Sequence, residues 1–269
     1  MSQEQFAKAL GTTPLSINRW ENGKTVPNKM AQTQLVEFCR EHQIDLFDYI
    51  AEQVRYIPTD KRMVVYHGSK KGIVGDIKPI SRAYCDFGRG FYLGTETSQP
   101  LTLICDEKSP KFYTLKFDLD GLNVLNVEMG LEWAMLIAYY RGYMKEAKGS
   151  RLYDRYAKMA DGYDVICGYI ANDRMYQVMK RFFEKEITDI ALINSLSVLD
   201  LGKQYVCLTE KACKHLEIVA TKELSALELA ILREKSILRR EEGIAKTEEI
   251  LVKYRREGRF FDEIMRGQL

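Results

Sequence analysis

The sequence predicts an α+β protein in which an antiparallel sheet is preceded and followed by helices. Short segments rich in β-branched and aromatic residues recur between residues 62 and 209, and this composition is typical of strands. Helical patterns separate only some of these segments, so the regular alternation of a doubly wound fold is missing. Residues 1–55 and 221–269 have helical patterns without strand patterns. These three observations favour an α+β core with helical ends.

The composition is that of an ordinary globular protein. The 269 residues exceed the usual size of one domain, and 46% hydrophobic with 29% charged residues are normal proportions. The net charge of +2 indicates no strong general attraction to nucleic acid or membranes. The first residues, MSQEQFAKAL, do not form a leader, and no apolar run reaches the roughly 18–20 residues of a membrane span. We therefore expect a cytoplasmic protein.

The cysteines and histidines do not have the spacing of metal ligands or of a disulfide framework. The six cysteines form no CxxC pair, and the three histidines lie far apart in the sequence. We expect reduced, buried thiols and no metal site.

Residues 1–55 are predicted to form a small all-α domain. Ser2 is placed to cap a first helix, and Gly11 is placed to end it. Thr13 and Pro14 then occupy the cap and first-turn positions of a second helix, which runs through Trp20. Two helices joined by such a short turn have the spacing of a helix-turn-helix. The side chains that we expect in the core of this pair are Phe6, Ala9, Leu10, Leu15, Ile17 and Trp20.

The stretch SQEQFAKALGTTPLSINRWENG closely resembles the Xre/Cro-type repressor domain, whose members commonly read SQxxLAxxLGvs…IsrWExG. The resemblance implies DNA binding by this module. The DNA-facing residues that it implies are Gln3, Thr13, Ser16 and Arg19. Residues 1–40 carry five basic and three acidic side chains, a thin excess for phosphate contacts. A helical module used for dimerisation or for docking a partner therefore remains an alternative to DNA binding.

Residues 62–220 are predicted to form the mixed domain. It begins after the segment YIPTDK, residues 56–61, which carries a proline and has no clear periodicity. The expected strands cover residues 62–67, 111–120, 163–170, 189–196 and 203–209, and the expected helices cover residues 131–147 and 174–184.

Two motifs in this domain occur in a specific order. The first predicted strand runs into YHGS, residues 66–69, and CDFGRGFYLG follows at residues 85–94. Together they resemble the NAD-binding core of the ADP-ribosyltransferases of the histidine, tyrosine, glutamate class. That class includes the poly(ADP-ribose) polymerases and diphtheria toxin, and the polymerases read HGS or HGT and then FGxGxYFA. Roughly residues 62–218 also resemble a bacterial domain family of unknown function placed in the same fold. The resemblance implies a split antiparallel β-sheet and NAD as the substrate.

The same resemblance implies a role for the residues of both motifs. The backbone of Gly68 would hold the nicotinamide carboxamide, because a glycine lets backbone groups approach a ligand closely. His67 would hydrogen-bond the adenosine ribose, and Ser69 would support the nicotinamide end. Either Tyr92 or Tyr84 would stack on the nicotinamide ring. The remaining site residues, which include two phenylalanines as a wall, are Tyr66, Asp86, Phe87, Gly88, Gly90 and Phe91.

These motifs have two other interpretations. Leu93 interrupts the GxGxxG spacing of a Rossmann turn, which makes that type of dinucleotide site a poor match. A glycine-rich bend between two strands, with His67 as an ordinary core histidine, is the purely structural alternative.

The third motif departs from the family pattern. The polymerases place a catalytic glutamate at the start of a strand reading NEYIVY, and the matching residue of KQYVC, residues 203–207, is Gln204. A glutamine accepts a hydrogen bond from a ribose hydroxyl, but it lacks the charge that stabilises a cationic sugar. Asp173 is our first candidate for a displaced catalytic acid and Asp86 is the second. Asp173 is equally well placed to cap the helix expected from residue 174.

We therefore expect an NAD-dependent mono-ADP-ribosyltransferase, a glycosyltransferase, because loss of the glutamate in the polymerase family accompanies single transfer. The pairing with a helix-turn-helix suggests a bacterial toxin or defence effector with a DNA-binding module. The alternative is a DNA-binding transcriptional regulator whose ADP-ribosyltransferase-like domain binds NAD without turnover. No residue pattern in the sequence identifies the acceptor of the ADP-ribose, which would be a protein or a nucleic acid.

Residues 221–269 are predicted to form a charged helical tail. Apolar residues recur every seven positions from Leu224 to Val252, but the complementary row continues from Leu227 into glutamates. A regular coiled coil is therefore not expected. We expect the apolar stripe to dock either on the body of the protein or on a second copy, which would make a homodimer.

Overall fold

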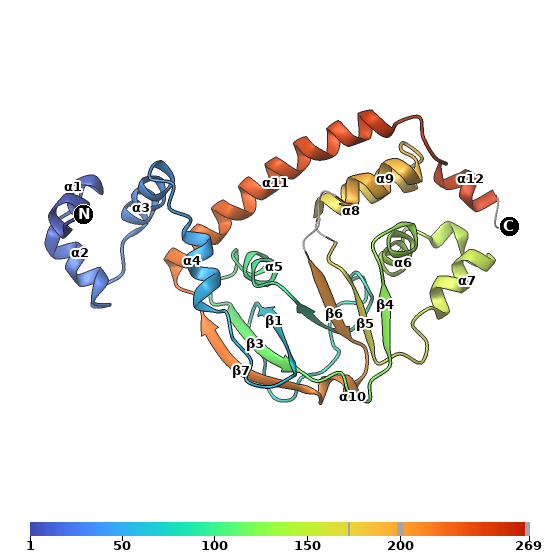
Figure 1. Cartoon of the computed structure of the whole chain (residues 1–269), viewed down its shortest axis with the longest axis horizontal. Coiled ribbons are helices and arrows are strands. Elements are labelled where there is room, and N and C mark those ends of the chain that lie inside the picture. Colours follow the sequence, from blue (N-terminus) through green and yellow to red (C-terminus); the bar gives the residue numbers. More distant parts are fainter. Residues whose placement is uncertain (172, 198–201, 267–269) are drawn as a thin grey trace.

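The computed structural model describes the chain except for residues 172, 198–201 and 267–269 (Figure 1). Its strands are β1 (Met63–Ser69), β2 (Phe91–Gly94), β3 (Lys111–Phe117), β4 (Val124–Val127), β5 (Val165–Tyr169), β6 (Lys203–Cys207) and β7 (Leu216–Glu223). Its helices are α1 (Gln3–Ala9), α2 (Pro14–Glu21), α3 (Lys29–Glu41), α4 (Leu46–Gln53), α5 (Ser98–Leu103), α6 (Leu131–Arg141), α7 (Arg151–Lys158), α8 (Asp173–Phe183), α9 (Asp189–Ser197), α10 (Glu210–Cys213), α11 (Ala226–Tyr254) and α12 (Phe261–Arg266), with a 3-10 turn at Lys145–Ala147.

Within the described residues, seven strands form one sheet in the order β4-β5-β6-β2-β1-β3-β7. Neighbouring strands are antiparallel except β4 and β5, which are parallel. β1 pairs with β3 over its whole length, but it shares with β2 only the pair Tyr66 and Gly94. The sheet is therefore nearly divided into one half of β4, β5, β6 and β2 and another of β1, β3 and β7 (Figure 1). This confirms the α+β class and a mostly antiparallel sheet.

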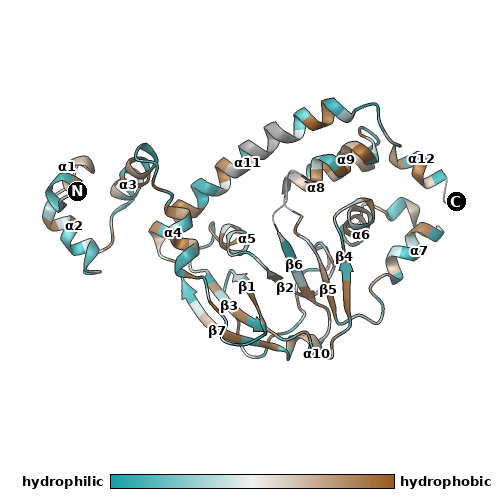
Figure 2. Ribbon diagram, in the orientation of Figure 1, coloured by the Kyte–Doolittle hydropathy of each residue, from teal (hydrophilic) through white to brown (hydrophobic). Residues whose placement is uncertain are grey.

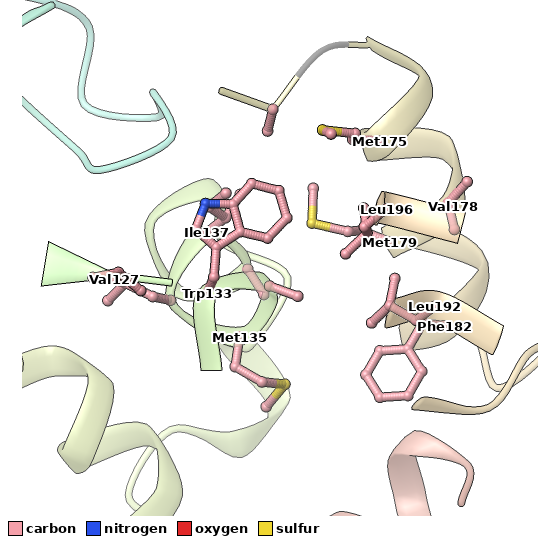
Figure 3. Close-up of a cluster of buried hydrophobic side chains, with 14 of the residues drawn as sticks. Val127, Trp133, Met135, Ile137, Met175, Val178, Met179, Phe182, Leu192 and Leu196 are labelled. Atoms are coloured by element: carbon pink, nitrogen blue, oxygen red, sulfur yellow. The ribbon is translucent and has the colours of Figure 1, made fainter. Parts of the chain in front are cut away.

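The larger hydrophobic core lies between the β5–β6 half of the sheet and the helices α6, α8 and α9. Trp133 of α6 is fully buried, and its indole N–H donates a hydrogen bond to the carbonyl of Tyr169 at 3.1 Å. Figure 3 shows Trp133 and Ile137 of α6 pointing toward side chains of α8 and α9 such as Met179 and Leu196. Figure 2 shows hydrophobic residues gathered in β5 and α9, whereas α2 is mostly hydrophilic. This core packs on β5 and β6, which belong to the same half of the sheet as β2.

A second core covers the other half of the sheet. Phe47 and Ile50 of α4 are buried with Tyr66 of β1 and Leu101 of α5, and Leu232 of α11 closes the same cluster. α4 therefore packs on the sheet. The division of the chain at residues 56–61 stays a prediction.

Most of the tail forms one long helix, α11, which extends from α4 past α5 to α8 and α9, and the short helix α12 follows it (Figure 1). Ser225 caps it, because its hydroxyl accepts the N–H of Glu228 at 3.3 Å while the Glu228 carboxylate accepts the N–H of Ser225 at 2.7 Å. Leu232 and Leu251 are buried by the body. Within the predicted stripe, Leu224 and Ile231 are buried, whereas Leu238 is 44% and Val252 is 64% exposed. Docking of the stripe on the body is thus confirmed only in part, and self-association stays a prediction. None of the described helices combines the length and the apolar character that a membrane span requires.

The strand predicted at residues 189–196 is wrong, because this segment forms α9. Its short apolar run fits a buried strand and a buried helix equally well, and periodicity does not separate the two. The decisive feature lies just outside the run, where the Thr188 hydroxyl accepts the N–H of Ala191 at 3.3 Å and starts a helix. The strands β2, β4 and β7 were not predicted, and the helix predicted at 131–147 ends at Arg141, where Gly142 has a φ of 81°.

The amino-terminal helices confirm the predicted caps. Ser2 and Thr13 each accept a backbone N–H at 3.2 Å, and Pro14 occupies the first turn of α2. Two core assignments are wrong, since Ala9 is exposed and Leu15 is 59% exposed. The small core of this module is built instead on Ala7, Leu10 and Ile17, partly covered by Phe6, Trp20, Leu35 and Phe38.

Candidate functional site at the division of the sheet

A cavity of about 760 Å³ opens where β1 and β2 separate. Residues 66–69 of β1, residues 91–94 of β2 and Gln204 of β6 line it, together with α5 and much of the segment 72–86. Ser236 of α11 also lines it, as do Arg141, Ile170, Ala171 and Tyr176. A volume of this size is typical of a small-molecule site.

His67 bridges the two halves of the sheet. Its Nδ1 lies 2.8 Å from the carbonyl oxygen of Tyr92, and its ring stacks on Phe91 with 4.3 Å between ring centres. A carbonyl oxygen only accepts, so Nδ1 carries the proton and Nε2 keeps its lone pair. Burial lowers the pKa of His67, and the hydrogen bond to Tyr92 opposes this shift only in part. The side chain is therefore a neutral hydrogen-bond acceptor in the lining of the cavity.

The end of β1 borders the cavity with the edge that faces away from β3. Beyond Tyr66, the edge of β1 that faces β2 has no strand partner among the described residues. On the face toward α5, a Cβ on Gly68 would lie only 2.5 Å from the carbonyl oxygen of Pro100 and 2.9 Å from Ile104. Glycine at position 68 is thus required for the close packing of α5 on β1. This packing keeps the open edge at Gly68 and Ser69 beside the cavity.

The glycine-rich stretch folds around the phenol of Tyr92. The hydroxyl of Tyr92 donates to the carbonyl of Gly88 at 2.8 Å and accepts the N–H of Phe87 at 3.0 Å. A Cβ on Gly90 would lie 2.3 Å from Val206, so only glycine lets the stretch approach β6 this closely. Burial, with a smaller contribution from the charge of Asp86, raises the pKa of Tyr92. Tyr92 therefore acts as a neutral clamp of this stretch.

Not every residue implied by the resemblance lies in the cavity wall. Tyr84 is 63% exposed and lies outside the described lining, whereas Tyr92 lines the cavity. Phe87 is fully buried beneath the cavity, where it fills the space over Gly168. Gly88 has a φ of 73° and packs against the ring of Tyr140. These residues shape the loop without facing the cavity.

Asp86 is the centre of a buried hydrogen-bond network. Its Oδ1 accepts from Arg141 at 2.7 Å and from the Tyr176 hydroxyl. Its Oδ2 accepts from the amide Nε2 of Gln204 at 2.9 Å and from the backbone N–H of Ala171 at 3.2 Å. The residue is only 6% exposed. Since a carboxylate has about four acceptor positions, Asp86 has none left for a ligand.

Gln204 is held by two acceptors. Its Nε2 donates to Asp86 at 2.9 Å and to the carbonyl of Tyr169 at 3.0 Å. Both amide hydrogens are thereby used, which identifies Oε1 as the polar atom left for the cavity. The orientation is not ambiguous, because a flipped amide would place Oε1 against two other acceptors.

Asp86 and Arg141 form an ion pair inside this network. Arg141 stacks on the ring of Tyr176 at 3.8 Å and forms an ion pair with Asp86. Burial works to lower the pKa of Arg141, but the hydrogen bond to Asp86 and the neighbouring charges, that of Asp86 first, together raise the pKa. Burial and the charge of Asp86 both raise the pKa of Tyr176. Arg141 therefore stays charged and Tyr176 stays neutral at physiological pH. No sequence pattern pointed to either residue.

The remaining lining residues include exposed cations and one further acid. Lys78, Arg82 and Asp76 all belong to the segment between β1 and β2. Asp173 is the first residue of α8, but its side chain lies outside the described residues. Among the residues that the structure describes, no cluster of three His, Cys, Asp or Glu side chains could hold a metal ion.

The predicted DNA-facing residues lie on the surface of α1 and α2. Thr13 caps α2, and its hydroxyl lies 3.0 Å from that of Ser16. Gln3 donates a hydrogen bond to Glu21, which joins the start of α1 to the end of α2. Arg19 is exposed. Four polar side chains are thus available on one small module, and the guanidinium of Arg19 is the only cation among them.

Two family models match the chain. The one described as "Protein of unknown function (DUF3990)" covers residues 63–218, and the one described as "Helix-turn-helix" covers residues 1–31. No curated protein and no solved structure matches. The first match spans the divided sheet and the cavity, and the second spans α1 and α2.

Proposed function

The chain belongs to the DUF3990 family and carries an amino-terminal helix-turn-helix, and we propose that it is an NAD-dependent mono-ADP-ribosyltransferase with a DNA-binding module. One observation carries the proposal. His67 of β1, Tyr92 of β2 and Gln204 of β6 come from three separate strands and line a single cavity. By the sequence resemblance, these residues match the histidine, tyrosine and glutamate positions of the transferase family.

The cavity offers partners for the nicotinamide, a ribose and the diphosphate of NAD. The open edge of β1 at Gly68 presents backbone groups that suit the nicotinamide carboxamide, and the aromatic ring of Tyr92 suits the nicotinamide ring. The bare Nε2 of His67 accepts a ribose hydroxyl. Lys78 and Arg82 supply positive charge for the diphosphate at the mouth of the cavity.

In the proposed reaction the glycosidic C–N bond of NAD breaks, and nicotinamide leaves with the bonding electrons. The C1′ carbon develops positive charge and forms a bond to a nucleophilic atom of the acceptor, which loses its proton to solvent. Gln204 contributes a hydrogen bond from the ribose hydroxyl to its Oε1. It contributes no full charge, which favours a single transfer over chain elongation.

A second function, NAD sensing by a DNA-binding regulator, is supported by a specific observation. Of the acids described in the lining, Asp86 has all its acceptor positions occupied and Asp76 is exposed. A cavity without a free buried carboxylate can bind NAD and still fail to cleave it. Both functions include NAD binding, so turnover distinguishes them.

The test is nicotinamide release and transfer of labelled ADP-ribose by the full chain, with a cell lysate present as acceptor. We expect His67→Ala to lower release by about 2- to 10-fold, the effect of losing one neutral hydrogen bond to a ribose hydroxyl. His215→Ala is the matched control, because the ring nitrogen of His215 also lies near a backbone carbonyl, that of Asp118 at 3.2 Å, but outside the cavity lining. NAD binding without release would support the regulator, and absence of NAD binding would refute both functions.

A toxin or defence role is a further part of the proposal. Expression of the wild-type chain should then slow growth, and His67→Ala should relieve this effect while His215→Ala should not. Equal growth with all three chains would remove the toxin role and leave the biochemical activity to the release assay.

A further inference from the structure

Asp86 and Gln204 form a buried carboxylate–amide pair at the position where the transferase family has its glutamate. Their side chains meet at 2.9 Å although they are 118 residues apart in sequence. We propose that Asp86 is a positioning residue that holds the Gln204 amide so that Oε1 faces the ribose of the ligand. The proposal rests on the proposed function, because it names the group that receives the NAD ribose hydroxyl.

The geometry excludes the alternative role for Asp86. A displaced catalytic acid must touch the substrate, but all four acceptor positions of this carboxylate are taken by protein donors from Arg141, Tyr176, Ala171 and Gln204. The negative charge also remains paired with the guanidinium. Asp86 can therefore act on a ligand only through one of these four donors.

Gln204 is the donor through which it acts. Free glutamine side chains exchange the positions of oxygen and nitrogen by rotation about the last torsion. Here the NH₂ group lies between two acceptors, Asp86 at 2.9 Å and the carbonyl of Tyr169 at 3.0 Å. Rotation would face Oε1 with two acceptors and lose two hydrogen bonds in a buried place. A carboxylate on the NH₂ side also polarises the amide, which makes Oε1 a stronger acceptor than an isolated glutamine would be.

The pair predicts an unexpected result for restoring the family glutamate. Gln204→Glu would remove the amide Nε2 that now donates to Asp86 at 2.9 Å. Two carboxylates would then be in contact without a hydrogen between them. One of the two would have to hold a proton, so the substitution should impair the site. Exchanging the partners with Asp86→Asn and Gln204→Glu together should repair it. The amide introduced at position 86 can donate to the new carboxylate, at the cost of the acceptor for the backbone N–H of Ala171. The network keeps one negative and one positive group.

The experiment is a double-mutant cycle on the full chain. NAD affinity is measured by calorimetry and turnover by nicotinamide release for the wild type, Asp86→Asn, Gln204→Glu and the double variant. We expect each single substitution to weaken NAD binding or turnover by about 10- to 100-fold. The double variant should exceed both single variants by at least about tenfold, since contacting residues are strongly non-additive. Independent losses that simply multiply in the double variant would overturn the proposal.

Asp164→Asn controls for loss of any buried aspartate. Asp164 is 8% exposed and accepts from the backbone N–H of Asn123 at 3.1 Å and from Thr209 and Lys211, each at 3.0 Å, outside the cavity lining. It should lower thermal stability and leave NAD affinity unchanged. Loss of affinity in Asp164→Asn equal to that in Asp86→Asn would reduce Asp86 to a stability residue.

A readout without NAD separates this proposal from the proposed function. In NMR spectra of the unliganded protein, the side-chain NH₂ protons of Gln204 should exchange slowly with solvent, and Asp86→Asn should speed their exchange by about 10-fold or more. Slow exchange in a chain that binds no NAD would support the positioning and refute the function. Fast exchange in the wild type, or an Asp86→Asn variant that keeps both NAD binding and turnover intact, would refute the positioning.

Discussion

Gly68→Ala tests the contact that keeps β1 open to the cavity. The new Cβ would lie 2.5 Å from the carbonyl oxygen of Pro100, and protein Cβ atoms essentially never come within 3.0 Å of another heavy atom. The backbone of α5 must then move by roughly 0.5 Å or more, and such overpacking costs about 1–3 kcal/mol. For a chain of this size that cost lowers Tm by about 2–12 °C. Residues of α5 line the cavity, so affinity for the proposed ligand NAD should fall as well.

Gly130→Ala is the matched control for this substitution. A Cβ at Gly130 meets nothing within 4 Å, and its φ of 164° is extended backbone that any residue adopts. Its Tm should stay close to that of the wild type in the same thermal unfolding series. If Gly68→Ala unfolds within about 1 °C of the wild type, α5 is free to shift, and close packing does not explain the glycine.

Three further outcomes are expected. Tyr92→Phe leaves the N–H of Phe87 and the carbonyl of Gly88 without their partner and should lower the free energy of unfolding by about 1–3 kcal/mol in urea titrations; an unchanged midpoint would contradict this. The folded-state pKa of His67 lies below its ordinary value of 6.5, so the unfolded chain binds more protons in that range and stability should fall as pH drops below about 6.5. His67→Gln should remove this part of the pH dependence, and an identical slope in both proteins would count against a buried neutral imidazole. Arg19→Ala should weaken DNA binding and reduce its salt dependence by about one phosphate contact, as measured by fluorescence anisotropy, whereas unchanged binding would place the DNA elsewhere.

Local chemistry explains which parts of the fold were predictable. Thr13 followed by Pro14 starts α2, and Ser2 starts α1, because caps and first-turn prolines act within three residues of the helix end. Four expected strands, at β1, β3, β5 and β6, have the β-branched and aromatic residues that fill both faces of a sheet. The segment of α9 has no such local signal inside the run, and its type was predicted wrongly.

The candidate site was predictable only as a set of positions. The order of YHGS, the glycine-rich stretch and Gln204 pointed to His67 and Tyr92, and both line the cavity with Gln204. The same motifs pointed equally to Phe87 and Tyr84, which do not line it. A motif states which residues are present near a strand end, but it does not state which side chains point inward from the loop.

By itself, the sequence determined the helical amino-terminal module and most of the strands. The tertiary structure alone decided that β1 and β2 part after a single residue pair, that protein donors saturate Asp86 and that Arg141 is one of them. Caps and strand composition act over a few neighbouring residues, so a linear pattern records them. The partners of Asp86 come from distant parts of the chain, 55 residues away at Arg141 and 118 residues away at Gln204. Their donors meet only when β2, β6 and α6 have packed together, because a hydrogen bond requires a specific distance and direction that folding alone supplies.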